Sequence, residues 1–180
     1  AHLVDVVTSD PRFASEPELA LTDAFFSVDE RFRDARDDDD CSGATALAAC
    51  VLNGELVVAN AGDCRAVLGS SPPPAEASSG RFLATRLTHD HNARMPLELL
   101  TLQREHPGET DVVVCKTPHA CYVKGRLQLT RALGDAYLKY PEFNQANTHR
   151  GRHITEPYTP PYVKSTPDIH HVRLSADDRF

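Results

Sequence analysis

The fold is decided by the stretch ATALAACVLNGELVVAN, residues 44–60. Two apolar runs flank Asn53-Gly54, and this dipeptide between such runs is the strongest short-range signal for a β-hairpin. Gly62-Asp63 then interrupts the apolar pattern, which resumes over residues 64–68. We therefore expect three consecutive antiparallel strands, with a Gly-Asp kink between the second and the third.

Two amphipathic helices are predicted around these strands. The first covers Ser15 to about Arg33, where Ser15-Glu16-Pro17-Glu18 matches a capping box with proline in the first turn. The second runs from Met95 to His106 and stops at Pro107-Gly108. The residues expected on the buried sides of the two helices are Leu21, Phe25, Val28 and Phe32, and Leu99, Leu100 and Leu102.

The rest of the chain adds short strands and two long loops. Strands are expected at 81–87, at 111–115 with 122–129, and at 169–174, with Phe180 opening another. Residues 70–80 and 141–167 are rich in proline and read as loops. Consecutive hairpins framed by helices predict a single α+β domain in layers, and they exclude a doubly wound parallel sheet.

The composition excludes several classes of function. The 180 residues carry 26 acidic against 19 basic side chains, for a net charge of −7, and 41% are hydrophobic. This balance argues against nucleic-acid and membrane-surface binding, which draw on basic patches. No apolar run approaches the roughly 20 residues that span a bilayer. We expect one folded domain with neither a nucleic-acid partner nor a membrane span.

The five cysteines form no C-x-x-C pair. A disulfide framework is therefore not expected, and an intracellular, reducing compartment is predicted, with cytoplasm, nucleus and mitochondrion left open. Cys115 and Cys121 flank a turn and could face each other across a hairpin. We expect them to be reduced neighbours at most.

Two acidic features are candidate cation ligands. Residues 34–40 are a charge run, DARDDDD, which could bind calcium but lacks the glycine and glutamate of an EF-hand loop, so a solvated loop is favoured. Asp63 follows a glycine that permits a bulge, and such a carboxylate at a strand end suits Mg²⁺ or Mn²⁺. From the spacing alone, an aspartate bonding its own backbone at the kink is the favoured alternative for Asp63.

Three other polar groups could carry chemistry. His89-Asp90-His91 and His170-His171 could contribute to a zinc site, but nothing makes the pairs converge, and polar loop residues are the favoured interpretation. Arg131 could clamp a phosphate, or it could pair with Asp135 four residues on. We favour the structural pair.

Four motifs, in this order, resemble those of the type 2C metal-dependent protein serine/threonine phosphatases, the PPM family. They are CSGATA (41–46), VANAGDCRAVL (58–68), LTHDHN (87–92) and LTRALGD (129–135). Further segments are most similar to the plant-type and pyruvate dehydrogenase phosphatase-like branch. These are VKGRLQ (123–128), AYLK (136–139), PEFN (141–144), PPY (160–162) and STPD (165–168).

The resemblance implies a fold and an activity. The fold would be two antiparallel sheets packed as a sandwich with helices outside. The activity would be hydrolysis of phosphoserine and phosphothreonine in a phosphoprotein substrate by water activated between two Mg²⁺ or Mn²⁺ ions. Asp63 matches the position of a carboxylate near a third metal, and the stretch from about Asn92 to Lys124 matches a flap that influences substrate choice.

The sequence also departs from the family pattern. The motifs that hold the two core metals, D-G-H-x-G, D-G-x-W-D/E and a late D-N pair, do not occur in residues 1–180. The first would lie before Ala1 and the second just after Phe180, with the phosphate-binding arginine also upstream. We therefore expect the middle of a catalytic domain, with no catalytic residue in the chain itself and no activity from it alone.

Two hypotheses follow for the complete protein. It is an active phosphatase, or it is a catalytically inactive relative that serves as a binding or structural subunit. In either case, exposed unpaired sheet edges would make this segment prone to association, so we expect it either to be poorly soluble in isolation or to be held by a partner chain that covers those edges.

Overall fold

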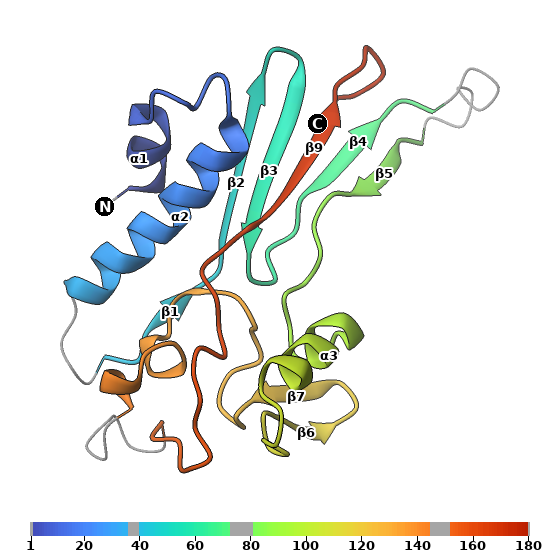
Figure 1. Ribbon diagram of the computed structural model, residues 1–180. Helices are drawn as coiled ribbons and strands as arrows, with labels where there is room; N and C mark the ends of the chain where they lie inside the picture. Colours follow the sequence, from blue (N-terminus) through green and yellow to red (C-terminus); the bar gives the residue numbers. More distant parts are fainter. Residues whose placement is uncertain (1, 36–39, 73–80, 145–151, 180) are drawn as a thin grey trace.

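The Asn53-Gly54 hairpin forms as predicted and builds the largest sheet (Figure 1). Strand β2 (Ala46–Leu52) pairs antiparallel with β3 (Glu55–Ala61), from Ala46 opposite Ala61 to Leu52 opposite Glu55. Strand β9 (Asp168–Arg173) pairs antiparallel with the other edge of β3, so the order is β2-β3-β9. This places β3 at the centre of the sheet.

The structure is a computed structural model that describes residues 2–35, 40–72, 81–144 and 152–179. Three expectations therefore fall wholly or largely outside the described residues. They are the charge run at 34–40, most of the loop at 70–80 and the strand opened by Phe180.

Strand β3 is buried on both faces, because a different layer packs against each. Val57, Ala59 and Ala61 alternate toward a cluster that includes Phe25, which is fully buried. Val58 points the other way, where it packs with Leu68 and Leu87. The near-continuous apolar run of β3 reflects this position between two layers.

Helices α1 (Leu3–Ser9) and α2 (Pro17–Asp34) form the layer on the first face of the sheet (Figure 1). Helix α2 begins after Glu16, which occupies the N-cap position, while the hydroxyl of Ser15 donates to the carbonyl of Arg12. The predicted capping box is therefore wrong, because Ser15 belongs to the preceding turn. The predicted apolar stripe is confirmed at Leu21 and Phe25 but weakens toward Phe32, which is 39% exposed.

The second layer is a separate two-stranded sheet. Strand β4 (Val67–Ser70) pairs antiparallel with β5 (Leu83–Arg86) and not with β3. The predicted three-stranded meander is therefore wrong at its third strand. At the end of β3, the left-handed backbone of Gly62, with φ 117°, turns the chain out of the first sheet.

The remaining elements form a second lobe below the sheets (Figure 1). Helix α3 (Pro96–Glu105) lies beside a hairpin of β6 (Val113–Thr117) and β7 (Ala120–Val123). On α3 only one of the three predicted leucines, Leu102, is buried, whereas Leu100 is 61% exposed. The other short elements are β1 (Gly43–Ala44), which pairs with β8 (Leu133–Gly134), and the 3₁₀ helices η2 (Ala136–Leu138) and η3 (Pro141–Phe143).

Residues 141–167 are loop-like as expected, but their described part is not confined to the surface. Ile154, Tyr162 and Val163 are buried in the core of the lower lobe with Val112 and Tyr137. The sparse apolar residues of this segment are thus core residues.

The expectation for the cysteine pair of the β6–β7 hairpin is corrected. Cys115 and Cys121 stand directly opposite each other in the register and are joined by a disulfide. The antiparallel pairing brings their Cα atoms to 3.9 Å, close enough for a bond that sequence spacing alone did not require. Among the described residues, Cys50 and Cys64 form no disulfide; the thiol of Cys50 contacts the carbonyl of Val57 and that of Cys64 contacts the hydroxyl of Thr45.

Together these layers confirm the predicted α+β class with antiparallel sheets and flanking helices. Within the described residues, no helix combines the length and apolarity needed to cross a bilayer.

Candidate functional site

The Gly62-Asp63 turn at the end of β3 lies at the centre of the candidate site. Gly62 is buried, and a Cβ there would lie 2.5 Å from Cγ2 of Thr45, so the left-handed backbone admits only glycine without rearrangement. Asp63 is exposed, and within the described residues its carboxylate makes neither a hydrogen bond nor an ion pair. The favoured alternative, in which Asp63 bonds its own backbone, is therefore not what the structure shows.

The backbone of this turn is held by His91, which is 1% exposed. The N–H of Gly62 donates to Nδ1 of His91 at 3.2 Å. Because Nδ1 accepts, Nε2 carries the proton and donates to Oδ2 of Asp168 at 2.8 Å. The imidazole thus connects the end of β3 to the start of β9.

Asp168 is bonded both by the imidazole of His91 and by the guanidinium of Arg131. The hydrogen bond from His91, together with the charge of Arg131, lowers the pKa of the Asp168 carboxyl to about 2, against an opposing contribution from partial burial. Nη1 of Arg131 lies 2.7 Å from Oδ1 of Asp168. The predicted pair between Arg131 and Asp135 is therefore wrong, because the guanidinium finds a carboxylate from a strand far along the chain.

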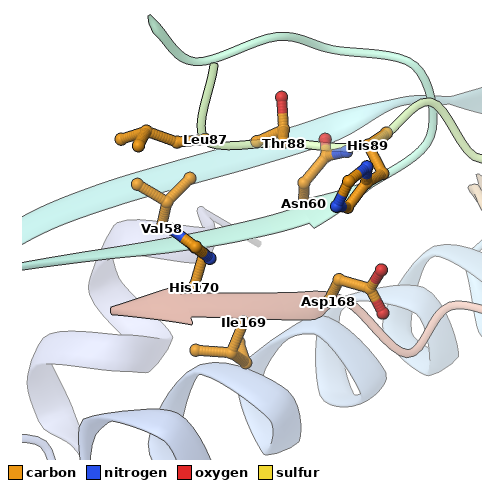
Figure 2. A pocket seen from close by; sticks show the side chains of 8 residues that line it. All are labelled: Val58, Asn60, Leu87, Thr88, His89, Asp168, Ile169 and His170. Atoms are coloured by element: carbon orange, nitrogen blue, oxygen red, sulfur yellow. Dashed lines mark hydrogen bonds between the residues drawn. The ribbon is translucent and has the colours of Figure 1, made fainter. Parts of the chain in front are cut away.

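Asn60 holds the turn from the opposite side. Its Nδ2 donates to the carbonyls of Gly62 at 3.0 Å and His89 at 3.2 Å. Within the described residues its buried Oδ1 has no partner. Asn60 lines a cavity of about 140 Å³. Figure 2 shows its lining side chains, which come from β3, β9 and the segment that leaves β5. Its lining consists of Val58, Asn60, Leu87, Thr88, His89, Asp168, Ile169 and His170.

The segment after the turn is held by the same LTHDHN motif. The hydroxyl of Thr88 accepts from the N–H of Ala66 at 3.0 Å and donates to the carbonyl of Cys64 at 3.2 Å. Asp90, also buried, is an ion-pair partner of Arg65 at 2.8 Å. His89, Asp90 and His91 lie in the loop after β5, as the favoured interpretation had it, but Asp90 and His91 are buried there and fix residues 62–66 in place.

The other sequence candidates lie apart from this turn. His170 and His171 are exposed and belong to strand β9 and not to a loop. Asp135 is 4% exposed, and burial raises the pKa of its carboxyl to about 6, although Lys139 and Arg152 act in the opposite sense. Asp135 follows Gly134, whose N–H donates to buried Asp29.

The segment from Asn92 to Lys124, expected to be a flap, ends in a buried charge network. Nζ of Lys124 donates to Oε2 of Glu109 at 2.9 Å, to Oδ1 of Asp111 at 2.7 Å and to the carbonyl of Pro157 at 2.8 Å. Burial raises the pKa of the Glu109 carboxyl, but hydrogen bonds from Thr159, Lys124 and Tyr162 outweigh it and hold that pKa below its usual value. The role of the segment from Asn92 to Lys124 as a flap stays a prediction.

The described residues offer one candidate ligand for a hard cation at this turn. The carboxylate of Asp63 is exposed and unengaged there, and one such oxygen donor can serve a Mg²⁺ or Mn²⁺ ion that keeps several waters. Among the residues that the structure describes, no group of three or more His, Cys, Asp or Glu side chains is placed to hold a metal ion.

Sequence reasoning missed the residues that position Asp63. His91, Asn60 and Asp168 come from three segments that meet only in the fold. The one signal available was the density of polar side chains in LTHDHN next to strand β5. That density of polar side chains indicated a functional segment, but it did not identify the residues that these side chains contact in the fold.

The arrangement of antiparallel sheets with helices outside, and an exposed aspartate at a glycine turn, defines a class of layered α+β proteins to which known structures can be compared. A serine-threonine phosphatase 2C from Toxoplasma gondii matches 98% of this chain and 58% of its own, with a TM-score of 0.60 and 18% identity. This likeness supports the fold alone.

Sequence comparison shows the family. The profile described as "PP2C: Protein phosphatase 2C" matches residues 1–180. The probable protein phosphatase 2C 72 of Oryza sativa subsp. japonica is 35% identical over 161 residues, which is 89% of this chain and 40% of that protein. The probable protein phosphatase 2C 67 of Arabidopsis thaliana is 37% identical over 139 residues, 77% of this chain and 35% of that protein. The chain belongs to the protein phosphatase 2C family, and it spans less than half the length of these curated relatives.

Proposed function

We propose that the phosphatase domain to which residues 1–180 belong hydrolyses phosphoserine and phosphothreonine in proteins with the help of Mg²⁺ or Mn²⁺. The observation that carries this proposal is the match of the family profile to the whole chain, joined to an exposed Asp63 on a turn braced from both sides. The names of the plant relatives, probable protein phosphatases 2C, support the same activity.

In this proposal the chain's own residues position one carboxylate. Gly62 allows the sharp turn, and His91 and Asn60 fix its N–H and its carbonyl. Thr88 and Asp90 then hold residues 64–66, so Asp63 projects from a backbone that is bonded on both sides. Such fixation keeps the carboxylate where it can hold a hydrated cation beside the reacting phosphoryl group.

Asp63 would hold a third, weaker cation, while the ligands of the two core ions lie outside this chain. A bound Mg²⁺ or Mn²⁺ ion supplies a water of lowered pKa and neutralises charge on the phosphoryl oxygens. We propose that residues 1–180 alone do not turn over phosphopeptide, since one carboxylate cannot hold two hard cations.

The test is a phosphate-release assay with a phosphothreonine peptide on the complete domain, without a divalent ion and with Mg²⁺ or Mn²⁺ added. We expect turnover that requires the ion and that chelation abolishes. A complete domain that folds but releases no phosphate with either ion would contradict the enzyme and favour the inactive phosphatase-like subunit.

The role of Asp63 is tested in the same domain by Asp63→Asn. Turnover should fall at least about tenfold, with the greatest loss at low Mn²⁺, because a weak ion site is removed. Asp5→Asn is the matched control, since Asp5 is also an exposed aspartate but lies on helix α1. Equal turnover in the two variants would remove Asp63 from the site.

A further inference from the structure

Three arginines from separate segments converge on one buried carboxylate beside the Asp63 turn. Arg65 donates to Asp90 from Nε at 3.0 Å and from Nη2 at 2.8 Å. Arg86, the last residue of β5, donates from Nη2 at 2.5 Å, and Arg94, just before α3, from Nη2 at 3.3 Å. We call Arg65, Arg86 and Arg94 the arginine cluster.

The arginine cluster carries more positive charge than its surroundings neutralise. Among the residues that the structure describes, Asp90 is the one carboxylate that forms ion pairs with the three guanidinium groups, and the charge of Asp63 also acts on Arg65. Three positive charges therefore face two negative ones. On a chain with a net charge of −7, this local excess marks the cluster as an unusual surface.

The guanidinium groups are fixed but still accessible. The side chains of Arg65, Arg86 and Arg94 are 56%, 44% and 38% exposed. Within the described residues, Nη1 of each makes no hydrogen bond, while Nε of Arg86 is also held by the carbonyl of Thr88 at 2.6 Å. Guanidinium groups held in place with donors to spare are suited to carboxylates and phosphates, and less entropy is lost when such a ligand binds.

We propose that the arginine cluster binds an anionic side chain of the phosphoprotein substrate, a carboxylate or a second phosphoryl group close to the phosphorylated residue. Arg65 is two residues from Asp63 in the same braced segment, so an anion on the cluster lies beside the proposed reaction site. That the bound peptide is a substrate rests on the proposed function, whereas the binding of an anion to the arginine cluster does not.

The test is fluorescence anisotropy with the 180-residue chain in metal-free buffer. Three labelled peptides are compared: a glutamate-rich peptide, the same peptide with glutamine in place of glutamate, and the glutamine peptide with one phosphoserine. We expect the glutamate-rich or the phosphoserine peptide to bind at least about tenfold more tightly than the glutamine peptide, and affinity to fall as salt is added. Which of the two binds identifies the source of the anion.

Two variants assign the binding to the cluster. Arg94→Gln and Arg86→Gln should each weaken the anionic peptide about tenfold, because each removes a charge-assisted contact. Asp90 keeps two arginine partners in either variant, and an unchanged thermal transition confirms the fold. Arg104→Gln, at an exposed position in the last turn of α3, is the matched control and should bind like the unaltered chain.

Equal binding of all three peptides, or equal losses in Arg94→Gln and Arg104→Gln, would overturn the proposal. Either result would leave the phosphatase activity of the complete domain untouched. Failure of the phosphate-release assay, in turn, would not alter metal-free peptide binding. The two proposals can therefore fail separately.

Discussion

The dipeptide Gly-Asp ends a strand twice in this molecule, with opposite results. Gly62-Asp63 follows β3 and Gly134-Asp135 closes β8, and both glycines have positive φ, 117° and 75°. A Cβ on either glycine would meet a neighbour at 2.5 Å or less. Yet Asp63 is exposed, whereas Asp135 is 4% exposed.

The difference shows that the dipeptide sets the backbone while the surroundings set the chemistry of the carboxylate. Asp63 lies on the protein surface, and its carboxylate oxygens have no hydrogen-bond or ion-pair partner within the described residues, so they are available to a cation. Asp135 lies near the buried pair of Asp29 and Lys139, and burial raises its pKa to about 6. The same dipeptide therefore gives a candidate cation ligand at Asp63 and a buried acid at Asp135.

The largest expected effect comes from the ion pair beneath Gly134. Nζ of Lys139 lies 2.7 Å from Oδ2 of Asp29, and both side chains are at most 4% exposed. Lys139→Met leaves Asp29 charged and buried, so we expect the free energy of unfolding to fall by about 3–5 kcal/mol. Urea denaturation measures this fall.

The control is Lys164→Met, which breaks the exposed pair with Glu105 and should cost less than about 1 kcal/mol. Similar losses in Lys139→Met and Lys164→Met would mean that the Gly134 region does not depend on its buried pair.

Alanine at the two glycines compares the two turns directly. Gly134→Ala sets a Cβ 2.4 Å from the carbonyl oxygen of Ser42, whereas Gly62→Ala meets the side chain of Thr45. We expect each to lose more than about 2 kcal/mol, with the greater loss at Gly134, because a backbone atom yields less than a side chain.

Gly108→Ala separates strain from contact. Gly108 also has positive φ, 91°, but a Cβ there would meet nothing within 4 Å. Its loss in the same urea measurement should be about 1 kcal/mol. If all three variants lost equal stability, the close contacts at Gly62 and Gly134 would contribute nothing to the loss in the free energy of unfolding.

Asp135→Asn should stabilise the chain at neutral pH. The folded state raises the pKa of Asp135 from 3.8 to about 6, so folding is favoured while the carboxyl holds its proton, and this contribution is lost as pH rises through about 6. Asparagine carries no charge to bury, so the variant should gain about 2–3 kcal/mol over the unaltered chain at pH 7. The gain should vanish near pH 4, and a gain that did not change with pH would contradict this origin.

Asp63→Asn should have the smallest effect on stability. Its exposed carboxylate makes no hydrogen bond or ion pair among the described residues, so we expect a change within about 0.5 kcal/mol in the free energy of unfolding at pH 7. A loss above about 1 kcal/mol would give Asp63 a structural role in place of the proposed cation site.

Local features were predicted well because they depend on neighbouring residues. Asn53-Gly54 fixes the β2–β3 hairpin, and Pro107-Gly108 stops α3 close to its predicted end. The family motifs added the fold class, because their order along the chain is specific. Asp63 was singled out by the glycine before it.

Contacts between distant segments could not be predicted from the same patterns. Arg131 had a nearby candidate in Asp135, but the fold delivers Asp168, which is bonded at the same time by His91. Likewise, β3 pairs with β9 across more than a hundred residues and not with residues 64–68. The site is built from such long-range pairings, so the residues that hold the Gly62-Asp63 turn could be identified only from the folded structure.

Titration of the Asp135 carboxyl by carbon-13 NMR tests most directly the claim that burial, and not the dipeptide, decides the chemistry of these aspartates. The signal is assigned by its absence in Asp135→Asn. We predict a titration midpoint near pH 6, because burial penalises the charged form. A midpoint at or below the ordinary aspartate value of about 3.9 would contradict the account.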